Sequence, residues 1–361
     1  MREVPIFMRQ AYFLGGTTAD GFRSRFFDRL SEPGMYSFIL KGGPGTGKST
    51  LMRRIAEAFG DETVSLYHCA SDASSLDAVV LEDRHILVAD GTAPHVMEVA
   101  QPMLTGEIVN LGALLNGEQL RGNQSEIAAL FAENARLHKR ARQYAQAVTS
   151  LHDDIRTAAQ NALLCEKLTA FSGRMLRRLL PRANGKAGTL SFHQLSALTA
   201  DGYITHALPG DYHIVLLKDP YFAGSDHLLH LFAQGAVMRG LNCLVSENYL
   251  FGEPQYEHLI LPECKIALLT ESTCTTPAGE FAQVLNFRRF YDKAELAKRR
   301  QRTAFGQKAS RSLLEEAAES IRSALNVHDD LEAYYIDALD FAGADHAAEQ
   351  ILARIKARSK A

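Results

Sequence analysis

The sequence from Gly42 to Ser49 reads GGPGTGKS, and this stretch is the strongest indication of the fold. It fits the pattern G-x-x-x-x-G-K-[ST], in which a glycine-rich loop ends in a lysine and a hydroxyl residue. An apolar segment at 37–40 precedes it, and residues 51–59 follow it with apolar side chains at every fourth position. A strand that leads through such a loop into a helix is the expected context of a phosphate-binding loop.

The residue types of this loop suit the binding of a nucleoside triphosphate. Glycines let the backbone curl so that several N–H groups point at phosphate oxygens, and the helix N-terminus adds partial positive charge. We expect Lys48 to reach the β- and γ-phosphates of ATP and Ser49 to bind Mg²⁺. The alternative is a glycine-rich turn that binds nothing. The predicted nucleotide-binding residues are Gly43, Pro44, Gly45, Thr46, Gly47, Lys48, Ser49 and Thr50.

A magnesium site also needs a carboxylate at the end of a neighbouring strand. Residues 86–89 are apolar and Asp90 follows them, so Asp90 is predicted to hold the metal together with Ser49. A strand-end aspartate can equally cap the next turn, and this alternative stays open.

The sequence is less decisive about the group that orients water or a substrate hydroxyl. Many ATP-hydrolysing motors place a glutamate directly after the strand-end aspartate, but here Gly91 follows Asp90. Asp72, Asp77 and His95 are the candidates, although each can also be a turn, cap or packing residue. The predicted catalytic set is Lys48, Asp90 and Asp72.

The chain carries a diverged internal duplication. Thr18-Ala19-Asp20-Gly21 recurs at 199–202 and His152-Asp153-Asp154 recurs at 328–330, so the two motifs repeat after 181 and 176 residues. A chance match would not keep this order and spacing across half a chain. We predict two copies of one unit, 1–181 and 182–361, joined at a turn-rich stretch near 181–185.

Each copy is predicted to be α/β. Apolar strands alternate with helical segments, which favours a parallel sheet covered on both faces. The expected strands are 37–40, 63–69 and 86–89 in the first copy, and 214–217, 241–246 and 266–269 in the second. Helical extensions are expected at 125–180, with a break near Ser172-Gly173, and at 293–324. The predicted fold class is therefore two tandem P-loop NTPase-like parallel-sheet domains with long helical segments, the second copy being degenerate.

The second copy has lost the chemistry of the loop. In an ungapped alignment, the residues opposite Gly42, Gly45, Lys48 and Ser49 are Asp219, Phe222, Ser225 and Asp226. We expect the backbone no longer to curl closely around phosphate where two glycines are lost. The missing ammonium group and the added carboxylate should abolish tight binding, because charge-assisted hydrogen bonds contribute about 1.5–3 kcal/mol each. We predict one nucleotide site per chain.

Motifs that the second copy keeps are interpreted as structural, because no nucleotide is expected there. On this reasoning His152-Asp153-Asp154 packs or caps a helix, and the motif at 18–21 also has a structural role. Asp72, Asp90 and His95 have no identical counterpart in the second copy, so they remain linked to the first site.

The composition is that of an ordinary soluble protein. The 361 residues are 46% hydrophobic and 22% charged, with a formal net charge of −3, so nothing global favours nucleic acid or an anionic membrane. Five cysteines without a C-x-x-C pair are typical of reduced thiols in a cytoplasmic protein, and we expect no signal peptide. Basic segments at 174–178 and 298–302 support nucleic acid binding only weakly, since a solvated helix face explains them as well.

The motifs also resemble those of a protein family. Residues 38–95, with the loop at 41–50, HCASD at 68–72 and DGTAPH at 90–95, resemble an uncharacterised bacterial family of tandem P-loop ATPases. GGTTADGF at 15–22 is similar to that family's N-terminal motif, and the resemblance covers essentially the whole chain. It implies two P-loop NTPase domains and ATPase activity, and it implies no known substrate. Members of the family often keep a phosphate loop in both halves, a pattern from which this chain departs at 219–226.

The sequence favours an ATP-binding, magnesium-dependent ATPase that acts as a nucleotide-driven switch with one live site per chain. The alternatives are a small-molecule kinase and an ATP-binding scaffold with negligible turnover. In the kinase, the acceptor would lie near Asp72, and one of four arginines would close over the phosphates: Arg121, Arg136, Arg140 or Arg142. A GTPase is disfavoured because the guanine-reading motif Asn-Lys-x-Asp is absent. The partner is an unknown macromolecule or a small-molecule acceptor.

Overall fold

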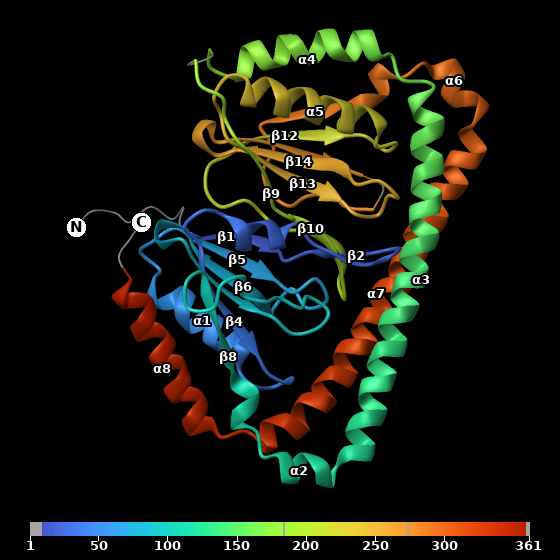
Figure 1. Ribbon diagram of the computed structural model, residues 1–361. Coiled ribbons are helices and arrows are strands. Elements are labelled where there is room, and N and C mark those ends of the chain that lie inside the picture. The colour runs from blue at the N-terminus through green and yellow to red at the C-terminus, as the bar shows by residue number, and fades with distance from the viewer. Residues whose placement is uncertain (1–8, 183–184, 273, 359–361) are drawn as a thin grey trace. The chain divides into compact units, whose positions relative to one another are not determined.

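The computed structural model describes residues 9–182, 185–272 and 274–358, and the chain folds into two compact units (Figure 1). Of the described residues, unit 1 comprises 9–15, 24–141 and 319–358, and unit 2 comprises 16–23 and 142–318. Residues 1–8, to which the expectation of no signal peptide refers, and residues 183–184 of the predicted linker lie outside the described residues.

Unit 1 is built on a six-stranded sheet in the order β1-β5-β6-β7-β4-β8. The strands are β1 (Arg9–Phe13), β4 (Tyr36–Lys41), β5 (Val64–His68), β6 (Leu76–Leu81), β7 (Ile86–Asp90) and β8 (Gly106–Asn110). All neighbours pair in parallel except at β6, which is antiparallel to both β5 and β7. The prediction of an α/β fold is confirmed, whereas the prediction of an all-parallel sheet is wrong.

Unit 2 repeats this topology. Its sheet has the order β9-β13-β14-β15-β12-β16, and its one antiparallel member, β14, stands in the place of β6. Two sheets with the same order and the same strand directions agree with an internal duplication. The strands are β9 (Leu190–Phe192), β12 (His213–Lys218), β13 (Cys243–Asn248), β14 (Gln255–Leu261), β15 (Ile266–Glu271) and β16 (Gln283–Asn286).

The antiparallel strand arises from a short connection in each unit. A single 3₁₀ turn, η2 (Glu82–Arg84) or η4 (Pro262–Cys264), joins β6 to β7 and β14 to β15. His85 and Lys265 follow these turns, and both have a φ of 49°. A link this short can reverse the chain between antiparallel neighbours, whereas parallel neighbours need a long crossover.

Eight α-helices lie in the described part of the chain. They are α1 (Lys48–Ala58), α2 (Gly117–Gly122), α3 (Gln124–Gln160), α4 (Cys165–Leu179), α5 (Ala223–Val237), α6 (Lys293–Lys298), α7 (Arg300–Asp337) and α8 (Phe341–Ala357). Further 3₁₀ turns are η1 (Phe26–Ser31), η3 (Leu111–Leu114) and η5 (Phe287–Phe290). Within the described ranges, no helix offers an apolar stretch long enough to cross a membrane.

The break in the first helical extension lies at 161–164, between α3 and α4, and the prediction of a break at Ser172-Gly173 is wrong. Ser172 lies inside α4, where its hydroxyl donates a hydrogen bond of 2.9 Å to the Leu168 carbonyl. A serine that bonds one turn back in this way is compatible with a continuous helix.

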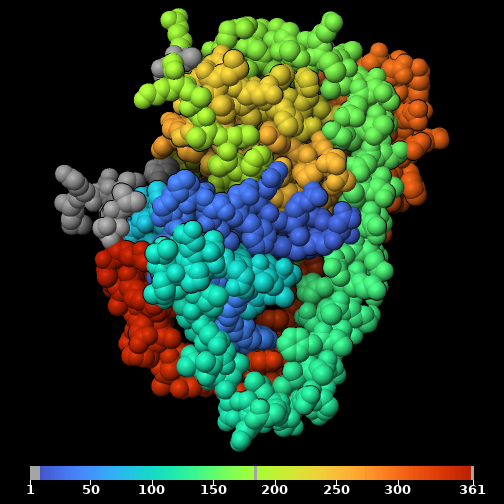
Figure 2. Space-filling model, viewed as in Figure 1, coloured from blue at the N-terminus to red at the C-terminus, as the bar shows by residue number. Residues whose placement is uncertain are grey.

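A large apolar cluster of unit 1 lies on one face of its sheet. Alternate residues of β4 (Tyr36, Phe38 and Leu40) pack into one apolar cluster with α1 and with Ile351 and Ile355 of α8. Burying each such side chain stabilises the fold by about 1.5–3 kcal/mol. Figure 2 shows α8, in red, at the surface beside the cyan segments of this unit.

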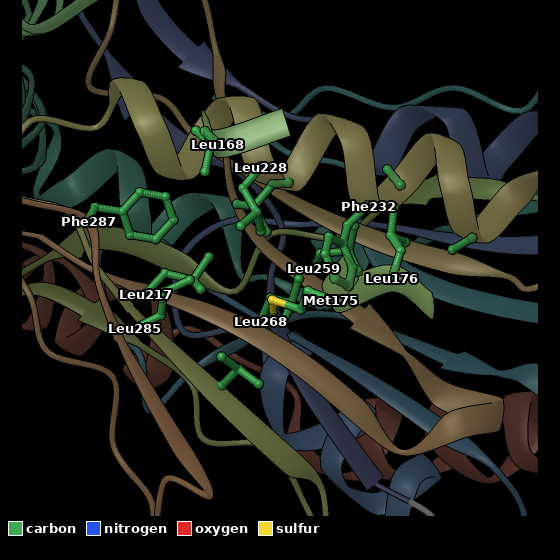
Figure 3. Close-up of a cluster of buried hydrophobic side chains, with 14 of the residues drawn as sticks. Leu168, Met175, Leu176, Leu217, Leu228, Phe232, Leu259, Leu268, Leu285 and Phe287 are labelled. Carbon is green, nitrogen blue, oxygen red and sulfur yellow. The ribbon is translucent and has the colours of Figure 1, made fainter. Parts of the chain in front are cut away.

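The core of unit 2 is the counterpart of this cluster. Side chains of α4 and α5, among them Leu168, Met175 and Phe232, lie over apolar residues of β12, β14 and β15 (Figure 3). The helix α4 thus comes from the first sequence copy but packs in unit 2, whereas α8 comes from the second copy and packs in unit 1. The two copies have exchanged their C-terminal helices.

The motif at 18–21 and its repeat form the same turn. Thr18 joins β2 (Gly16–Thr18) to β3 (Gly21–Arg23): its hydroxyl donates to the Gly21 carbonyl at 2.9 Å and accepts from the Asp20 N–H at 3.1 Å. Thr199 makes both bonds at 3.0 Å between β10 (Ser196–Thr199) and β11 (Gly202–Thr205). The structural interpretation of this motif is confirmed.

Candidate functional site

The glycine-rich loop of unit 1 lies between β4 and α1, as its sequence context predicts. Gly45 and Gly47 have φ angles of 67° and 79°, in the left-handed region that glycine adopts without strain. Thr46 is 2% exposed, and its hydroxyl donates a bond of 2.8 Å to the Gly43 carbonyl. The loop therefore turns tightly into the first turn of α1, which begins at Lys48.

Lys48 and Asp90 are brought together at this loop. The Lys48 Nζ donates to the carbonyl oxygens of Gly43 at 2.8 Å and Gly42 at 3.2 Å, and it lies 3.6 Å from Asp90 Oδ2. The two side chains are only 12% and 14% exposed. An ammonium group is thus held over the loop, with a carboxylate beside it at the end of β7.

Ser49 and Asp90 present oxygen ligands of the kind that Mg²⁺ prefers. The Ser49 hydroxyl, in the first turn of α1, accepts a bond of 3.0 Å from the Leu76 N–H. Asp90 Oδ1 accepts from the N–H and the hydroxyl of Thr92, at 2.8 and 2.6 Å, while Oδ2 faces Lys48. Asp90 therefore caps the following turn with one oxygen and keeps the other in the site. Thr50 is exposed on the next position of α1.

A buried acid and a buried histidine lie behind Asp90. Asp77 is 7% exposed and His95 is 5% exposed, and Asp77 Oδ2 is 3.9 Å from His95 Nε2. Burial raises the pKa of Asp77 to about 6, the charge of Asp90 adds to this rise, and His95 and Lys48 oppose it. The Asp77 carboxyl group therefore holds its proton more readily than an exposed aspartate does.

Asp72, which the sequence places in the catalytic set, has a local role in the structure. Its Oδ1 accepts bonds from the N–H and the hydroxyl of Ser74, at 2.8 and 2.7 Å, within the turn between β5 and β6. Its main-chain carbonyl accepts from the Ser75 N–H at 3.0 Å. Of the two candidate aspartates, Asp77 is the one whose electrostatic neighbours include Lys48 and Asp90.

The C-terminal end of α7 lies directly on the loop, which sequence reasoning did not foresee. Glu332 Oε1 accepts a bond of 3.1 Å from the Gly45 N–H. A Cβ atom added at Gly43 would lie 2.6 Å from the Tyr335 ring, and one added at Gly45 would lie 2.9 Å from Ile336. The glycines are therefore needed for contact with α7 as well as for the turn.

One sequence signal could have located this contact. The repeated His-Asp-Asp motif lies on α3 and on α7. In unit 2 the first residue of the motif, His152, contacts the loop, and in unit 1 Glu332, four residues after His328, contacts the loop. In unit 2, His152 is fully buried, with its ring centroid 5.0 Å from that of Phe222. His152 is thus a packing residue, as predicted, whereas its counterpart His328 lies 3.8 Å from Glu332 beside the phosphate loop.

The degenerate loop of unit 2 is filled by its own side chain. Asp219, opposite Gly42 in the alignment, is fully buried, and its Oδ2 accepts from the N–H groups of Gly224 and Ser225 at 2.9 and 2.8 Å. The Tyr291 hydroxyl lies 3.0 Å from both of its oxygens. A carboxylate therefore accepts hydrogen bonds from the amide groups at the start of α5 that correspond to predicted phosphate-binding positions in unit 1.

One expectation about this loop needs correction. Phe222 has a φ of 63°, close to the 67° of Gly45, so the left-handed turn survives the loss of glycine. The ring of Phe222 packs against those of His152 and Phe251, with centroids 5.0 and 4.9 Å away. This packing offsets the strain of a left-handed conformation in a bulky residue. The backbone of this loop therefore keeps its left-handed turn. The Asp219 carboxylate occupies the position that a bound anion would take.

Comparisons with known proteins add nothing to this picture: no family model, no curated protein and no solved structure matches the chain. The resemblance to tandem P-loop ATPases thus stays a prediction from the motifs, and the functional argument depends on the geometry of the two loops.

Proposed function

We propose that the chain binds ATP with Mg²⁺ at the loop of unit 1 and acts as an ATPase with one live site. The observation that carries this proposal is the position of Lys48, whose ammonium group is hydrogen-bonded to the loop carbonyls of Gly42 and Gly43 and lies 3.6 Å from the strand-end carboxylate Asp90. An inward-facing set of N–H groups and one lysine at a helix N-terminus is an arrangement that holds a polyphosphate chain.

Each residue then has a defined task. The loop amides and Lys48 bind the phosphate oxygens, and they stabilise the charge that develops on the transferred phosphoryl group. Ser49 and Asp90 would hold Mg²⁺, which supplies charge neutralisation when it is bound. We assign the orientation of the attacking water to Asp77 in place of Asp72, because Asp77 and His95 form the buried pair beside Asp90.

Restricting the proposal to one site follows from the second loop. The amides of Gly224 and Ser225 are bound by the carboxylate of Asp219, and Ser225 stands where unit 1 has its lysine. A triphosphate would have to displace a buried, hydrogen-bonded carboxylate there and would gain no ammonium partner. Displacing that carboxylate would cost more free energy than the new phosphate contacts would contribute.

Phosphate release from purified full-length protein tests the proposal and separates its alternatives. The protein is incubated with ATP, GTP, CTP or UTP and Mg²⁺, with and without nucleic acid, and thermal unfolding is followed in parallel. An ATPase releases phosphate, a kinase keeps ATP intact until an acceptor is added, and a scaffold is stabilised by ATP without turnover. Lys48→Ala should abolish turnover and ATP stabilisation together. Unchanged stabilisation by ATP in this variant would refute the proposed site.

A further inference from the structure

We propose that Glu332 is an internal anion that competes with phosphate for the loop of unit 1, so that a nucleotide binds only after the C-terminal end of α7 has been displaced. This inference rests on the proposed function, because it concerns the regulation of the same site. It assigns the regulatory role to a helix that comes from the second sequence copy.

Glu332 directly occupies one of the backbone amides of the loop. The Gly45 N–H donates to Glu332 Oε1 at 3.1 Å, and that N–H belongs to the set that would hold phosphate oxygens. One N–H cannot give a full hydrogen bond to two acceptors at once. A carboxylate and a polyphosphate in the same loop also repel each other as like charges.

The second argument is steric. Tyr335 and Ile336 lie so close to Gly43 and Gly45 that a single added methyl group would collide with them. The Tyr335 ring is held in turn by Phe131 of α3, at a centroid distance of 6.5 Å. The last turns of α7 therefore pack in direct contact with the loop, and any ligand that changes the shape of the loop has to move them.

The third argument comes from the duplication. In unit 2 the equivalent helix, α3, meets the equivalent loop through His152, so the contact between long helix and loop is common to both units. The residue four positions on is Arg156, whose Nη2 lies 3.6 Å from Asp226 Oδ2. At the same position of α7 stands Glu332. Both units thus share a contact between the long helix and the loop. In unit 1 this contact includes a carboxylate that accepts a hydrogen bond from a loop amide, whereas in unit 2 the residue at that position is an arginine.

The geometry also makes the contact reversible. The side chain of Glu332 is 36% exposed, and that of its neighbour His328 is 42% exposed. A carboxylate at the edge of the solvent can move into water together with the end of α7 at little cost, unlike the fully buried Asp219 of unit 2. Glu332 can therefore leave the loop of unit 1, whereas Asp219 is part of the core of unit 2.

The test compares ATP affinity in the full-length protein by isothermal titration calorimetry with Mg²⁺. Glu332→Gln removes the competing charge with little change in size, and we expect ATP to bind about tenfold more tightly, equivalent to about 1.4 kcal/mol. Asp330→Asn removes the same charge from an exposed position two residues away on α7 and serves as the matched control. Its affinity should stay within about twofold of wild type.

The outcomes separate this inference from the proposed function. If wild type binds ATP and Glu332→Gln binds it equally or more weakly, the inference is overturned and the nucleotide site stands. Weaker binding would indicate that Glu332 helps to hold the ligand, for example through a cation shared with His328. If neither protein binds ATP, both proposals fail.

Hydrogen exchange of the α7 backbone gives a second, independent readout. Addition of ATP should speed exchange at 330–337 in wild type, because its contacts with the loop are broken, and should have no such effect in Lys48→Ala. Unchanged or slower exchange in ATP-bound wild type would contradict displacement of α7.

Discussion

The charge of a buried residue is set by its neighbours, and Glu257 of β14 shows this most clearly. It is only 3% exposed, and it accepts hydrogen bonds from the Tyr203 hydroxyl at 2.8 Å and the Asn248 amide at 2.9 Å. Burial raises the pKa of Glu257 to about 7, and the bonds from its neighbours lower it only in part. Between about pH 4.5 and pH 7 the folded protein thus retains a proton that the unfolded chain has largely released.

This shift predicts a pH dependence of stability. Between about pH 4.5 and pH 7 the folded state binds more protons at Glu257 than the unfolded state, so its contribution to the unfolding free energy is present at low pH and lost as pH rises through this window. Glu257→Gln has no proton to lose. The stability of wild type relative to this variant should therefore fall by roughly 3 kcal/mol from pH 4.5 to pH 8.

Urea unfolding at several pH values measures this difference, and Glu253→Gln, at an exposed position of the same unit, controls for the loss of one charge. A difference between wild type and Glu257→Gln that is independent of pH would show that the glutamate is ionised in the folded protein.

At the residue scale the sequence predicted the parts of the site that a local motif specifies. Lys48 and Ser49 follow from the loop pattern, and the structure places Asp90 beside Lys48 as its position after an apolar strand suggested. Glu332 was missed because it reaches the loop from a helix 287 positions further along the chain. Asp77 was weighed but not chosen, since its burial beside His95 depends on tertiary packing that no spacing reveals.

At the element scale the apolar runs predicted β4, β5 and β7 and their counterparts in the second copy to within a residue or two. They did not identify β6 and β14 as strands, and so missed the antiparallel pairing, because a short apolar run cannot be told from a buried helix segment by its pattern alone. The break between α3 and α4 was misplaced since Ser172 satisfies its hydroxyl within the helix.

The exchange of C-terminal helices gives a prediction for α8. Ile351 is fully buried in the core of unit 1, although it belongs to the second sequence copy. Ile351→Ala should destabilise unit 1 by about 2–5 kcal/mol, because it leaves a cavity in that core. Hydrogen exchange should then accelerate in α1 and β4 and not in α5 and β12.

Glu349→Ala, at an exposed position of the same helix, is the matched control and should leave exchange unchanged. Faster exchange confined to unit 2 after Ile351→Ala would show that α8 packs in the unit of its own sequence copy.

At the scale of the whole molecule, two sheets with the same strand order carry two different loops, as expected if the chain is an internal duplication. One loop keeps glycines, a lysine and a magnesium-type hydroxyl at the start of α1, and the other has sealed the corresponding amides with Asp219. The sequence predicted this asymmetry from the lost lysine. It could not predict that the Asp219 carboxylate would accept hydrogen bonds from the N–H groups of Gly224 and Ser225, because this depends on the direction of the Asp219 side chain.

The stoichiometry of ATP binding shows whether the loop of unit 1 is a nucleotide site and the loop of unit 2 is not. Isothermal titration calorimetry of the full-length chain with ATP and Mg²⁺ should give one ATP per chain for wild type and for Ser225→Ala, and no binding for Lys48→Ala with its fold verified by circular dichroism. Two ATP molecules per chain, or binding that survives Lys48→Ala and disappears in Ser225→Ala, would contradict the account.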